Sequence, residues 1–433
     1  MKSNRLVFLT IPGLRKKDIQ HMPHLSQLAD AGSVSRVQHA FPAVTWPSQC
    51  AVLTGKPPSE HGIVSNGLFW REDNKVEMWT AWNEVIQQPQ IWDLLKERNL
   101  KTAAWFPMLS KGCGADYVCM PAPIHQPDGS EDLWCYTKPQ EFYGQLLEEM
   151  GHFPLQHFWG PMANIKSSQW IVDSAIRCAK EFQPDFFYIY LPHLDYAAQK
   201  FGPDSEQAMQ AVVDLDSLLG HLLEQMNQCL ENPAWMVHSE YVISAVDHVS
   251  YPNRILRESG LLKTCTQDDQ PHEYLDFENS SAWAMVDHQF SHVFVKDHDP
   301  AIIKQVADLF ADVEGIDQVL TGTSREGLDH PRSGDVILVS KPNSWQAYYW
   351  WLDDTVAPPF ARSVDIHRKP GYDPVELSFD MATRSVPLDA TIIKGSHGVI
   401  QDNDQGVIVA ANCDLPAAVT EAEIFESVLK SFG

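Results

Sequence analysis

The most informative residues of this chain surround a single threonine. Thr45 stands between Pro42 and Pro47 in the run FPAVTWPSQCAVLTGKPPSEHGIVSN, directly before a stretch that predicts a helix. A hydroxyl at a helix N-terminus lies beside backbone N–H groups and the positive end of the helix dipole. Such a threonine could attack phosphorus while the negative charge of the phosphate is accommodated. The alternative is a threonine that caps a helix in a surface turn.

Three later segments carry further groups that could act on a phosphate. Asp195 follows the apolar run Phe186–Leu191 in the sequence HLDYAAQKFGP, and Glu240 follows Ala234–His238 in the sequence SEYV. His397 lies near the C-terminus in the sequence GSHG. Because chemistry in parallel sheets gathers at the carboxyl ends of the strands, Asp195 and Glu240 are expected at that edge.

The run T-G-x-x-P-x-x-H-G-I-x-x-N, which begins nine residues after Thr45, completes a segment with a familiar pattern. The segment resembles the nucleophile region of the alkaline phosphatase superfamily, in its nucleotide pyrophosphatase/phosphodiesterase branch. The resemblance implies that a metal-activated Thr45 attacks phosphorus and forms a phosphothreonine intermediate. It also implies that Asn66 donates a hydrogen bond to a nonbridging phosphate oxygen. Enzymes of this superfamily usually hold two metal ions with Asp and His ligands from strand ends.

The metal ligands implied by the resemblance are only partly present. Where an Asp is expected after the first strand, this chain has Pro12, and the expected D-x-x-x-H becomes Asp195 followed by Gln199. The expected S-D-H-G becomes SEYV, in which Glu240 keeps a carboxylate on a longer stem. The implied ligands are thus Asp195, His397, Glu240 and Gln199. The expected cofactor is one or two divalent ions, Zn²⁺ or Mn²⁺, with Mg²⁺ also suited to oxygen-rich ligands.

Three outcomes are open for this centre. It could hold a single ion on the retained ligands, recruit other groups, or have lost both its metals and its chemistry. Each candidate recruit has an ordinary alternative: a core position for His193, a turn at 287–288, and a solvated charged loop at 365–376. The recruits considered are His193, Asp287, His288, Asp365 and His367, with Arg368 as a phosphate contact beside Arg362 and Lys369.

The composition limits the classes of partner. The 433 residues include 32 Lys and Arg against 57 Asp and Glu, which gives a net charge of −25. This balance argues against binding to nucleic-acid polymers or anionic membranes, because both need basic protein surface. A small phosphorylated substrate, such as a nucleotide, stays compatible because a bound cation can invert the local field. The sequence does not set the oligomeric state.

Cysteines and apolar runs bear on the cellular location. The eight cysteines form no C-x-x-C pair, so the sequence predicts neither a zinc ribbon nor a redox motif. The apolar run Leu6–Ile11 is too short for a signal peptide and predicts a first buried strand instead. No apolar stretch approaches the ~20 residues that a membrane span requires. A cytoplasmic protein is therefore expected.

Strands alternate with amphipathic helices along most of the chain. Apolar runs at Leu6–Ile11, Thr102–Phe106, Phe186–Leu191 and Ala234–His238 predict buried strands, separated by segments with helical periodicity. This alternation predicts an α/β fold with three layers, α/β/α, around a mostly parallel sheet. We expect core over 1–246, continued core with an inserted cap over 247–389, and a return to the core over 390–433.

The leading expectation is a metal-dependent hydrolase of phosphoric ester or anhydride bonds, of the phosphodiesterase or nucleotide pyrophosphatase type. A phosphomonoesterase, a phosphonate or sulfate-ester hydrolase, and a mutase or transferase are alternatives on the same scaffold. A binding protein that has lost catalysis is a further alternative. It is motivated by Pro12, Gln199 and Tyr241, which remove one carboxylate and two imidazoles from the implied site.

Overall fold

A nine-stranded sheet forms the centre of the computed structural model, which describes residues 5–125, 131–267, 270–325, 327–400, 406–413 and 415–433. Its strands are β1 (Leu6–Ile11), β2 (Ser33–Gln38), β5 (Thr102–Trp105), β6 (Tyr117–Pro121), β9 (Cys135–Lys138), β10 (Phe186–Tyr190), β11 (Ala234–Ser239), β22 (Val407–Ala411) and β23 (Ala418–Thr420). Their order is β23-β2-β22-β11-β1-β10-β5-β6-β9. Five of the neighbouring pairs are parallel, whereas β2–β22, β11–β22 and β6–β9 are antiparallel.

The middle strands explain why the sheet was predictable. Every residue of β1, β10 and β11 is buried, as expected for parallel strands that helices cover on both faces. Thr10 pairs with Tyr190 on one side and with His238 on the other, so the three strands end at the same edge. The strands predicted from the sequence are confirmed to within one residue at each end, and the mostly parallel α/β fold is confirmed.

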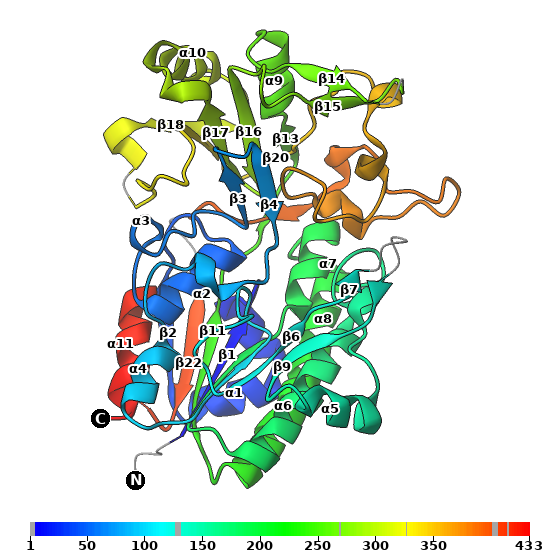
Figure 1. Ribbon diagram of the computed structural model, residues 1–433. Coiled ribbons are helices and arrows are strands. Elements are labelled where there is room, and N and C mark those ends of the chain that lie inside the picture. Colours follow the sequence, from blue (N-terminus) through cyan, green and yellow to red (C-terminus); the bar gives the residue numbers. More distant parts are fainter. Residues whose placement is uncertain (1–4, 126–130, 268–269, 326, 401–405, 414) are drawn as a thin grey trace.

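Helices cover both faces of this sheet (Figure 1). One layer contains α1 (Pro23–Asp30), α6 (Ile165–Phe182), α7 (His193–Phe201) and α8 (Glu206–Cys229), with α8 in contact with the other three. The opposite layer contains α2 (Thr45–Thr54), α4 (Ile91–Glu97) and α11 (Glu421–Ser431), in which α11 contacts both α2 and α4. The expected three-layer arrangement is therefore observed, with α2 and α7 each reaching the edge where β1, β10 and β11 end.

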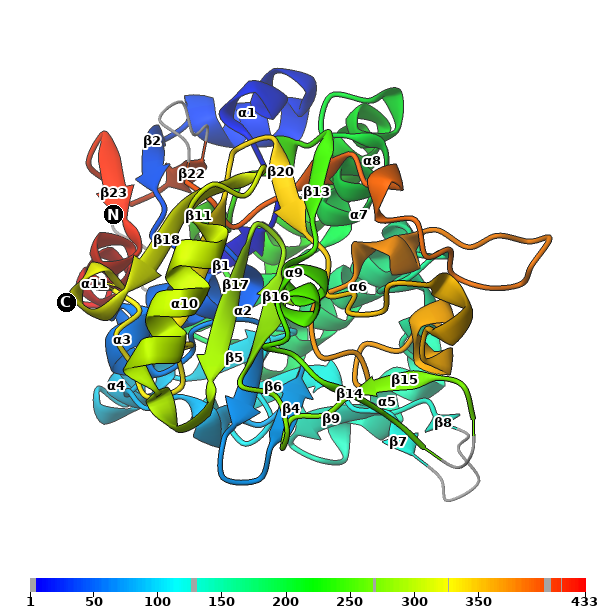
Figure 2. The same ribbon diagram turned by 90° about the horizontal axis from the view of Figure 1, so that it is seen from above.

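A second, antiparallel sheet stands above the first in Figure 1 and is seen from above in Figure 2. Its order is β16-β17-β19-β18, with β16 (Ala282–Asp287), β17 (Phe290–Val295), β18 (Ile316–Thr321) and β19 (Val336–Ser340). The helix α10 (Pro300–Phe310) packs on β18 and β19, and α9 (Pro252–Glu258) packs on β16. Residues 282–340 thus form a separate sheet inside the segment expected to hold a cap.

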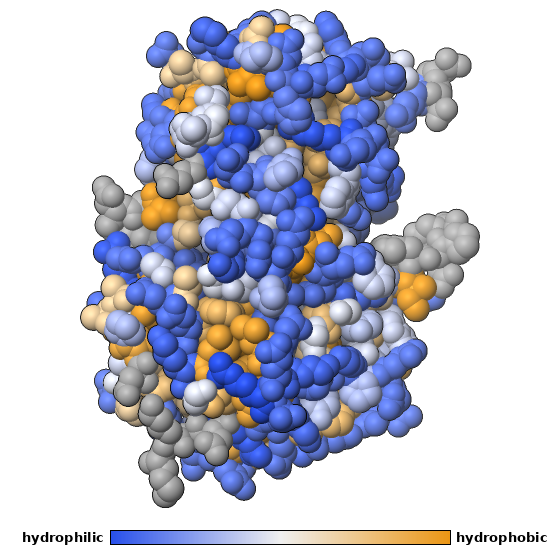
Figure 3. Space-filling model, turned by 60° about the vertical axis from the view of Figure 1, so that its left-hand side comes forward, coloured by the Kyte–Doolittle hydropathy of each residue, from blue (hydrophilic) through white to orange (hydrophobic). Residues whose placement is uncertain are grey.

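Short elements complete the two halves. Paired strands are β3 (Gly67–Trp70) with β4 (Lys75–Met78), β7 (Ile124–His125) with β8 (Glu131–Asp132), β12 (Ser244–Ala245) with β21 (Gly395–Ser396), β13 (His248–Ser250) with β20 (Ser344–Gln346), and β14 (Thr264–Thr266) with β15 (Glu273–Leu275); short helices are α3 (Pro58–His61) and α5 (Phe142–Met150). Among the described residues, no helix has the length and apolar character needed to cross a bilayer. The face in Figure 3 is mostly hydrophilic, with hydrophobic residues gathered in its lower half.

Candidate functional site

The predicted residues meet where the large sheet faces the second sheet. Thr45 is the first residue of α2, and Asp195 and Gln199 lie on α7, directly after β10. Glu240 follows β11, and His397 follows β21. All five side chains are buried, and Thr45 is 5% exposed. The edge of the sheet therefore collects the residues that the sequence placed there.

A short hydrogen-bonded chain starts at Thr45. Its Oγ1 lies 3.3 Å from the hydroxyl oxygen of Tyr241, which in turn lies 3.3 Å from Asp195 Oδ1. Burial raises the pKa of Tyr241 well above its usual value, so this residue stays a neutral donor. Tyr241 directs its single proton to Asp195, which leaves its oxygen able to accept from the hydroxyl of Thr45. The lone pairs of Thr45 Oγ1 are then left for another partner.

Gln199 and Tyr372 hold Asp195 from the other side. Asp195 and Gln199 are four residues apart on α7, a spacing that places both on one helix face. Gln199 donates from Nε2 to Asp195 Oδ2 at 2.9 Å and accepts at Oε1 from the hydroxyl of Tyr372 at 2.7 Å. Tyr372 was missed by the sequence argument, although it lies in the segment 365–376 that was examined for charged residues. Both oxygens of Asp195 are thus bonded by protein groups.

Four aromatic rings lie in a row beside this network, with the two outer pairs stacked and the two histidines tilted by 43°. The ring centroids of Tyr241 and His397 are 3.6 Å apart, those of His397 and His288 are 3.8 Å apart, and those of His288 and Tyr372 are 3.6 Å apart. Each imidazole is fixed through Nδ1, His397 on the carbonyl of Ala43 at 2.8 Å and His288 on Asp287 Oδ1 at 2.6 Å. Burial lowers the pKa of both histidines well below the usual value, so both are neutral. The proton on Nδ1 leaves a lone pair on Nε2 of each ring.

His397 keeps one atom without a partner. Its Nε2 is buried, makes no hydrogen bond among the described residues, and lies 4.0 Å from Asp195 Oδ1. An unpaired buried nitrogen is costly, and it is the atom that would ligate a metal or accept a proton. His397 and Asp195, two of the ligands that the resemblance implies, therefore lie close together, and their role as ligands stays a prediction.

Asn66 and Asp287 connect α2 to the second sheet. The backbone N–H of Trp46 donates to Asn66 Oδ1 at 2.9 Å, while Asn66 donates to Asp287 from its backbone at 2.8 Å and from Nδ2 at 3.1 Å. The backbone N–H groups at the start of α2 were expected to be available to a phosphate, but the three residues after Thr45 offer none. Trp46 N–H bonds to Asn66, Pro47 has no N–H, and Ser48 N–H bonds to the carbonyl of Val44 at 3.0 Å. The role of Asn66 as a phosphate donor stays a prediction.

The carboxyl groups of the site hold their protons unusually tightly. Burial raises the pKa of Asp195 to about 7, of Glu240 to about 8 and of Asp287 to about 6. Glu240 Oε2 accepts from Thr10 Oγ1 at 3.0 Å and from Gln49 Nε2 at 2.9 Å, and these bonds offset part of the effect. At neutral pH the centre therefore carries less negative charge than its three carboxyl groups suggest.

The other candidate residues lie in different surroundings. His193 is buried at the first position of α7, and neither ring nitrogen has a hydrogen bond among the described residues. Arg368 pairs with Asp365 at 2.5 Å on the surface, and a ring nitrogen of His367 lies 3.3 Å from the carbonyl of Met78. Lys369, a predicted phosphate contact, is instead buried between Asp373 and Glu376 at 2.8 and 2.6 Å.

Asp287 and His288 are brought to the site. From the sequence they are candidate recruits with a turn at 287–288 as the ordinary alternative, and the structure combines the two. In the structure Asp287 is the last residue of β16, and His288 occupies the turn to β17 with a positive φ of 58°. This turn directs the imidazole of His288 onto Tyr372 and His397. The left-handed backbone is uncommon for a residue other than glycine and is typical of functional sites.

The donor set does not fit the metal centre that the resemblance implies. Nowhere in the described part of the chain do three His, Cys, Asp or Glu side chains come together as ligands of one ion. Pro12 supplies no side-chain donor, and the amide nitrogen of Gln199, which cannot ligate, faces Asp195. Tyr241 occupies the remaining direction between Thr45 and Asp195. No chemical step below is therefore assigned to a metal ion.

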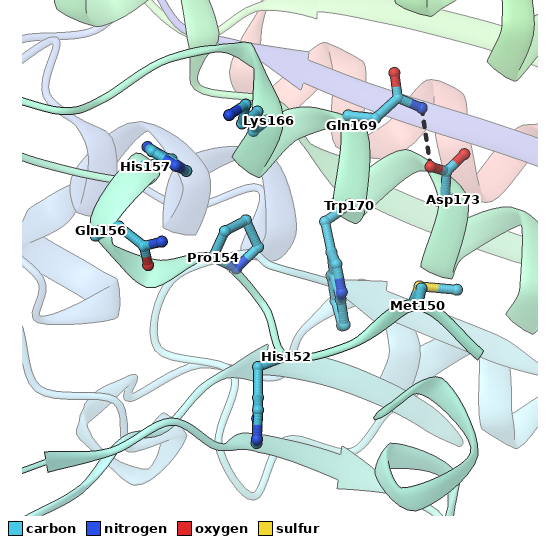
Figure 4. A pocket seen from close by; sticks show the side chains of 9 residues that line it. All are labelled: Met150, His152, Pro154, Gln156, His157, Lys166, Gln169, Trp170 and Asp173. Carbon is cyan, nitrogen blue, oxygen red and sulfur yellow. Dashed lines mark hydrogen bonds between the residues drawn. The ribbon is translucent and has the colours of Figure 1, made fainter. Parts of the chain in front are cut away.

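A shallow hollow of about 350 Å³ lies elsewhere, over the N-terminal half of α6 (Figure 4). In Figure 4 Trp170 stands on its wall, and Gln169 donates to Asp173 at 2.9 Å. Its lining shares no residue with the network around Thr45. The residues that line it are Met150, His152, Pro154, Gln156, His157, Lys166, Gln169, Trp170 and Asp173.

Comparison with known families agrees with this geometry. Residues 6–373 match the type I phosphodiesterase / nucleotide pyrophosphatase family. The chain belongs to this family. The resemblance first seen at Thr45 is thereby confirmed, and the match covers the second sheet and seven of the nine strands of the large sheet, all except β22 and β23.

Curated relatives are distant and longer. The chain is 22% identical to an uncharacterized pyrophosphatase/phosphodiesterase of Schizosaccharomyces pombe, over 48% of this chain and 37% of the relative. It is 24% identical to the bis(5'-adenosyl)-triphosphatase ENPP4 of Bos taurus, over 51% of this chain and 43% of the relative. The alignments thus span less than half the length of either relative.

Solved structures share the fold over almost the whole chain. Murine ectonucleotide pyrophosphatase / phosphodiesterase 5 in complex with AMP matches with a TM-score of 0.62 at 13% identity, covering 99% of this chain and 94% of that one. Phosphonoacetate hydrolase of Sinorhizobium meliloti in complex with phosphonoacetate matches with a TM-score of 0.64 at 16% identity, covering 99% and 96%. At these identities the likeness concerns the fold.

Proposed function

We propose that this protein is a phosphoryl-transfer hydrolase that cleaves phosphoric ester or anhydride bonds, with Thr45 as the nucleophile. The proposed substrate class is a small phosphodiester or pyrophosphate that contains a nucleotide. Family membership over 6–373 supports the reaction class. The observation that carries the proposal is the directed chain from Thr45 to Tyr241 to Asp195, because it draws the threonine proton away from the attacking oxygen.

The proposed step can be written with this chain's own residues. Thr45 Oγ1 forms a bond to phosphorus as the bond between phosphorus and the leaving oxygen breaks. The Thr45 proton passes to Tyr241 while the Tyr241 proton passes to Asp195, and the leaving oxygen takes a proton from solvent. Water then attacks phosphorus as the bond to Thr45 Oγ1 breaks, and it gives one proton to solvent. The threonine oxygen regains its proton from Asp195 through Tyr241, and the phosphate product is released. The N-terminal end of α2 favours the negative phosphoryl group throughout.

A second candidate is a protein that binds a phosphate ester without turning it over. The specific observation in its favour is that Asp195 and Asn66 have hydrogen-bond partners within the protein on each side-chain group that would serve catalysis. A network satisfied in this way is stable without a substrate. This candidate retains the family fold and uses Thr45 as a contact rather than a nucleophile.

Hydrolysis of bis-(p-nitrophenyl) phosphate by purified protein distinguishes the two candidates. We expect turnover by the wild type and its loss in Thr45→Ala, with AMP binding retained in calorimetry. The matched control is Thr54→Ala, which removes a buried threonine hydroxyl from the other end of α2, where it donates to the carbonyl of Cys50 at 2.6 Å and accepts from the backbone N–H of Lys56 at 3.2 Å. Full turnover by Thr45→Ala would remove Thr45 from the mechanism. Binding of AMP without turnover of phosphodiester, phosphomonoester, phosphonate or sulfate ester would select the second candidate.

A further inference from the structure

We propose that this centre operates without a bound divalent cation, because the side chains of Tyr241, Gln199 and Glu240 make protein hydrogen bonds at positions where relatives of this fold would be expected to bind metal. The inference rests on the proposed function only in taking Thr45 as the reacting residue. It concerns how Thr45 and Asp195 are held, which can be measured whether or not turnover is observed.

Too few side chains of the described residues are placed to ligate a metal ion at this centre. An ion in a protein is usually held by three or more protein ligands, and Zn²⁺ most often by four or by three plus water. Asp195 and His397 are the two retained donors that converge, 4.0 Å apart. Gln199 turns its amide nitrogen toward Asp195, and its oxygen already accepts from Tyr372. Reversing the amide would set its oxygen against the carboxylate of Asp195 and lose the bond between these two side chains.

The hydroxyl of Tyr241 lies between Thr45 and Asp195. The ring of Tyr241 lies almost parallel to that of His397, with an interplanar angle of 7° and a centroid separation of 3.6 Å. Its hydroxyl contacts both Thr45 Oγ1 and Asp195 Oδ1 at 3.3 Å. A cation that bridged the same two oxygens would stand about 2.0–2.2 Å from each of them and would compete with this hydroxyl. The phenol thus links by hydrogen bonds two groups that a metal would otherwise link.

Glu240 directs one carboxyl oxygen to protein hydrogen-bond donors. The longer side chain directs Oε2 to the hydroxyl of Thr10 and the amide of Gln49, at 3.0 and 2.9 Å. Gln49 is itself fixed, because its Oε1 accepts from the backbone N–H of Met108 at 2.8 Å. Glu240 therefore belongs to a bonded set within the large sheet and α2. Moving Oε2 onto an ion would leave those two buried donors unpaired, whereas Oε1 is buried with no hydrogen-bond partner among the described residues.

The test combines metal analysis with activity. Protein purified without chelator or metal-affinity steps is analysed for its elements, titrated with Zn²⁺ and Mn²⁺, and assayed with bis-(p-nitrophenyl) phosphate before and after EDTA. We expect less than about a tenth of an ion per chain and turnover that EDTA leaves unchanged. The inference would be overturned if the wild type held one ion per chain and the variant His397→Ala lost both the ion and turnover. The proposed function would still stand in that case. A metal-free protein without turnover would overturn the proposed function and support the inference.

A gain-of-metal variant makes the test independent of activity. Replacing the four departures by the residues of the resemblance, Pro12→Asp, Gln199→His, Glu240→Asp and Tyr241→His, should bring Zn²⁺ affinity up by about a hundredfold or more. Tyr241→His alone is the second variant, in case the fourfold variant does not fold. The control is Thr54→Ala, which should bind Zn²⁺ no better than the wild type. The inference would be overturned if the wild type and all folded variants each bound one Zn²⁺ ion per chain with equal affinity.

Discussion

Lys369 offers the sharpest test of how the site is supported. Its side chain is 1% exposed and pairs with Asp373 at 2.8 Å and with Glu376 at 2.6 Å. Glu376 also accepts from Trp159 Nε1 at 2.8 Å. The same short segment contains Tyr372, which reaches Gln199 and stacks on His288. The substitution Lys369→Met keeps the length of the side chain and removes its charge, leaving two buried carboxyl groups without their cation.

The expected cost follows from this burial. Removing one partner of a buried ion pair typically destabilises a protein by about 3–5 kcal/mol. In a chain of 433 residues that corresponds to a fall in Tm on the order of 3–6 °C. Burial alone would lower the pKa of Lys369, but Asp373 and Glu376 outweigh it and raise the pKa above its usual value. The contribution is therefore complete at neutral pH and is lost only as pH rises through the folded-state pKa.

The measurement is urea unfolding at neutral pH followed by tryptophan fluorescence. The matched control is Lys304→Met, because Lys304 is 74% exposed and pairs at 2.5 Å with Asp308 one helical turn away. An exposed pair of this kind contributes at most about 0.5 kcal/mol. If Lys369→Met lowered the free energy of unfolding no more than Lys304→Met, the argument from the buried cluster would be refuted.

Three further outcomes are expected. Tyr241→Phe keeps the ring on His397 but removes the link between Thr45 and Asp195, so kcat for bis-(p-nitrophenyl) phosphate should fall about a hundredfold with little change in KM; equal kcat values would exclude the relay. Glu240 is protonated in the folded state well above the pH at which it ionises when unfolded, so stability should fall as pH rises from about 4.5 toward 8. Glu240→Gln should flatten that slope in thermal melts from pH 5 to 8, and an unchanged slope would contradict the assignment. Asn66→Ala should lower the free energy of unfolding in urea by about 2–4 kcal/mol, because Trp46 N–H and Asp287 lose buried partners. A smaller decrease than that of Thr54→Ala would show that the bonds of Asn66 to Trp46 and Asp287 contribute little.

The strands of the large sheet could be predicted because each one leaves a local signal. A strand buried on both faces is a continuous apolar run, and Leu6–Ile11 appears in the structure with the same bounds. Residues that follow such runs share the sheet edge, which is why Glu240 and Asp195 could be placed near one another. The helix α6 begins at Ile165 because Asn164 caps it by accepting from Lys166 N–H at 3.0 Å.

Contacts between distant segments could not be predicted in this way. Asn66 and Asp287 are 221 residues apart, and Tyr372 and Gln199 are 173 residues apart. No local pattern encodes those distances. The charged segment 365–376 looked like a solvated loop, yet it packs Lys369 inside and delivers Tyr372 to the site. The substitution of Tyr241 for an imidazole was visible in the sequence, but its bond to Asp195 depends on where β11 and α7 end relative to each other.

The stacked rings also have a consequence for how the molecule opens. Tyr241 extends from the large sheet, whereas His288 belongs to the turn of the second sheet, and the bonds of Asn66 to Asp287 fasten α2 to that same turn. Separating the two sheets would break these contacts together. The two halves should therefore act as one cooperative unit in hydrogen exchange, with amides of β10 and β17 released at similar free energies. The centre at Thr45 would then disappear only through global unfolding, not through local opening of one half.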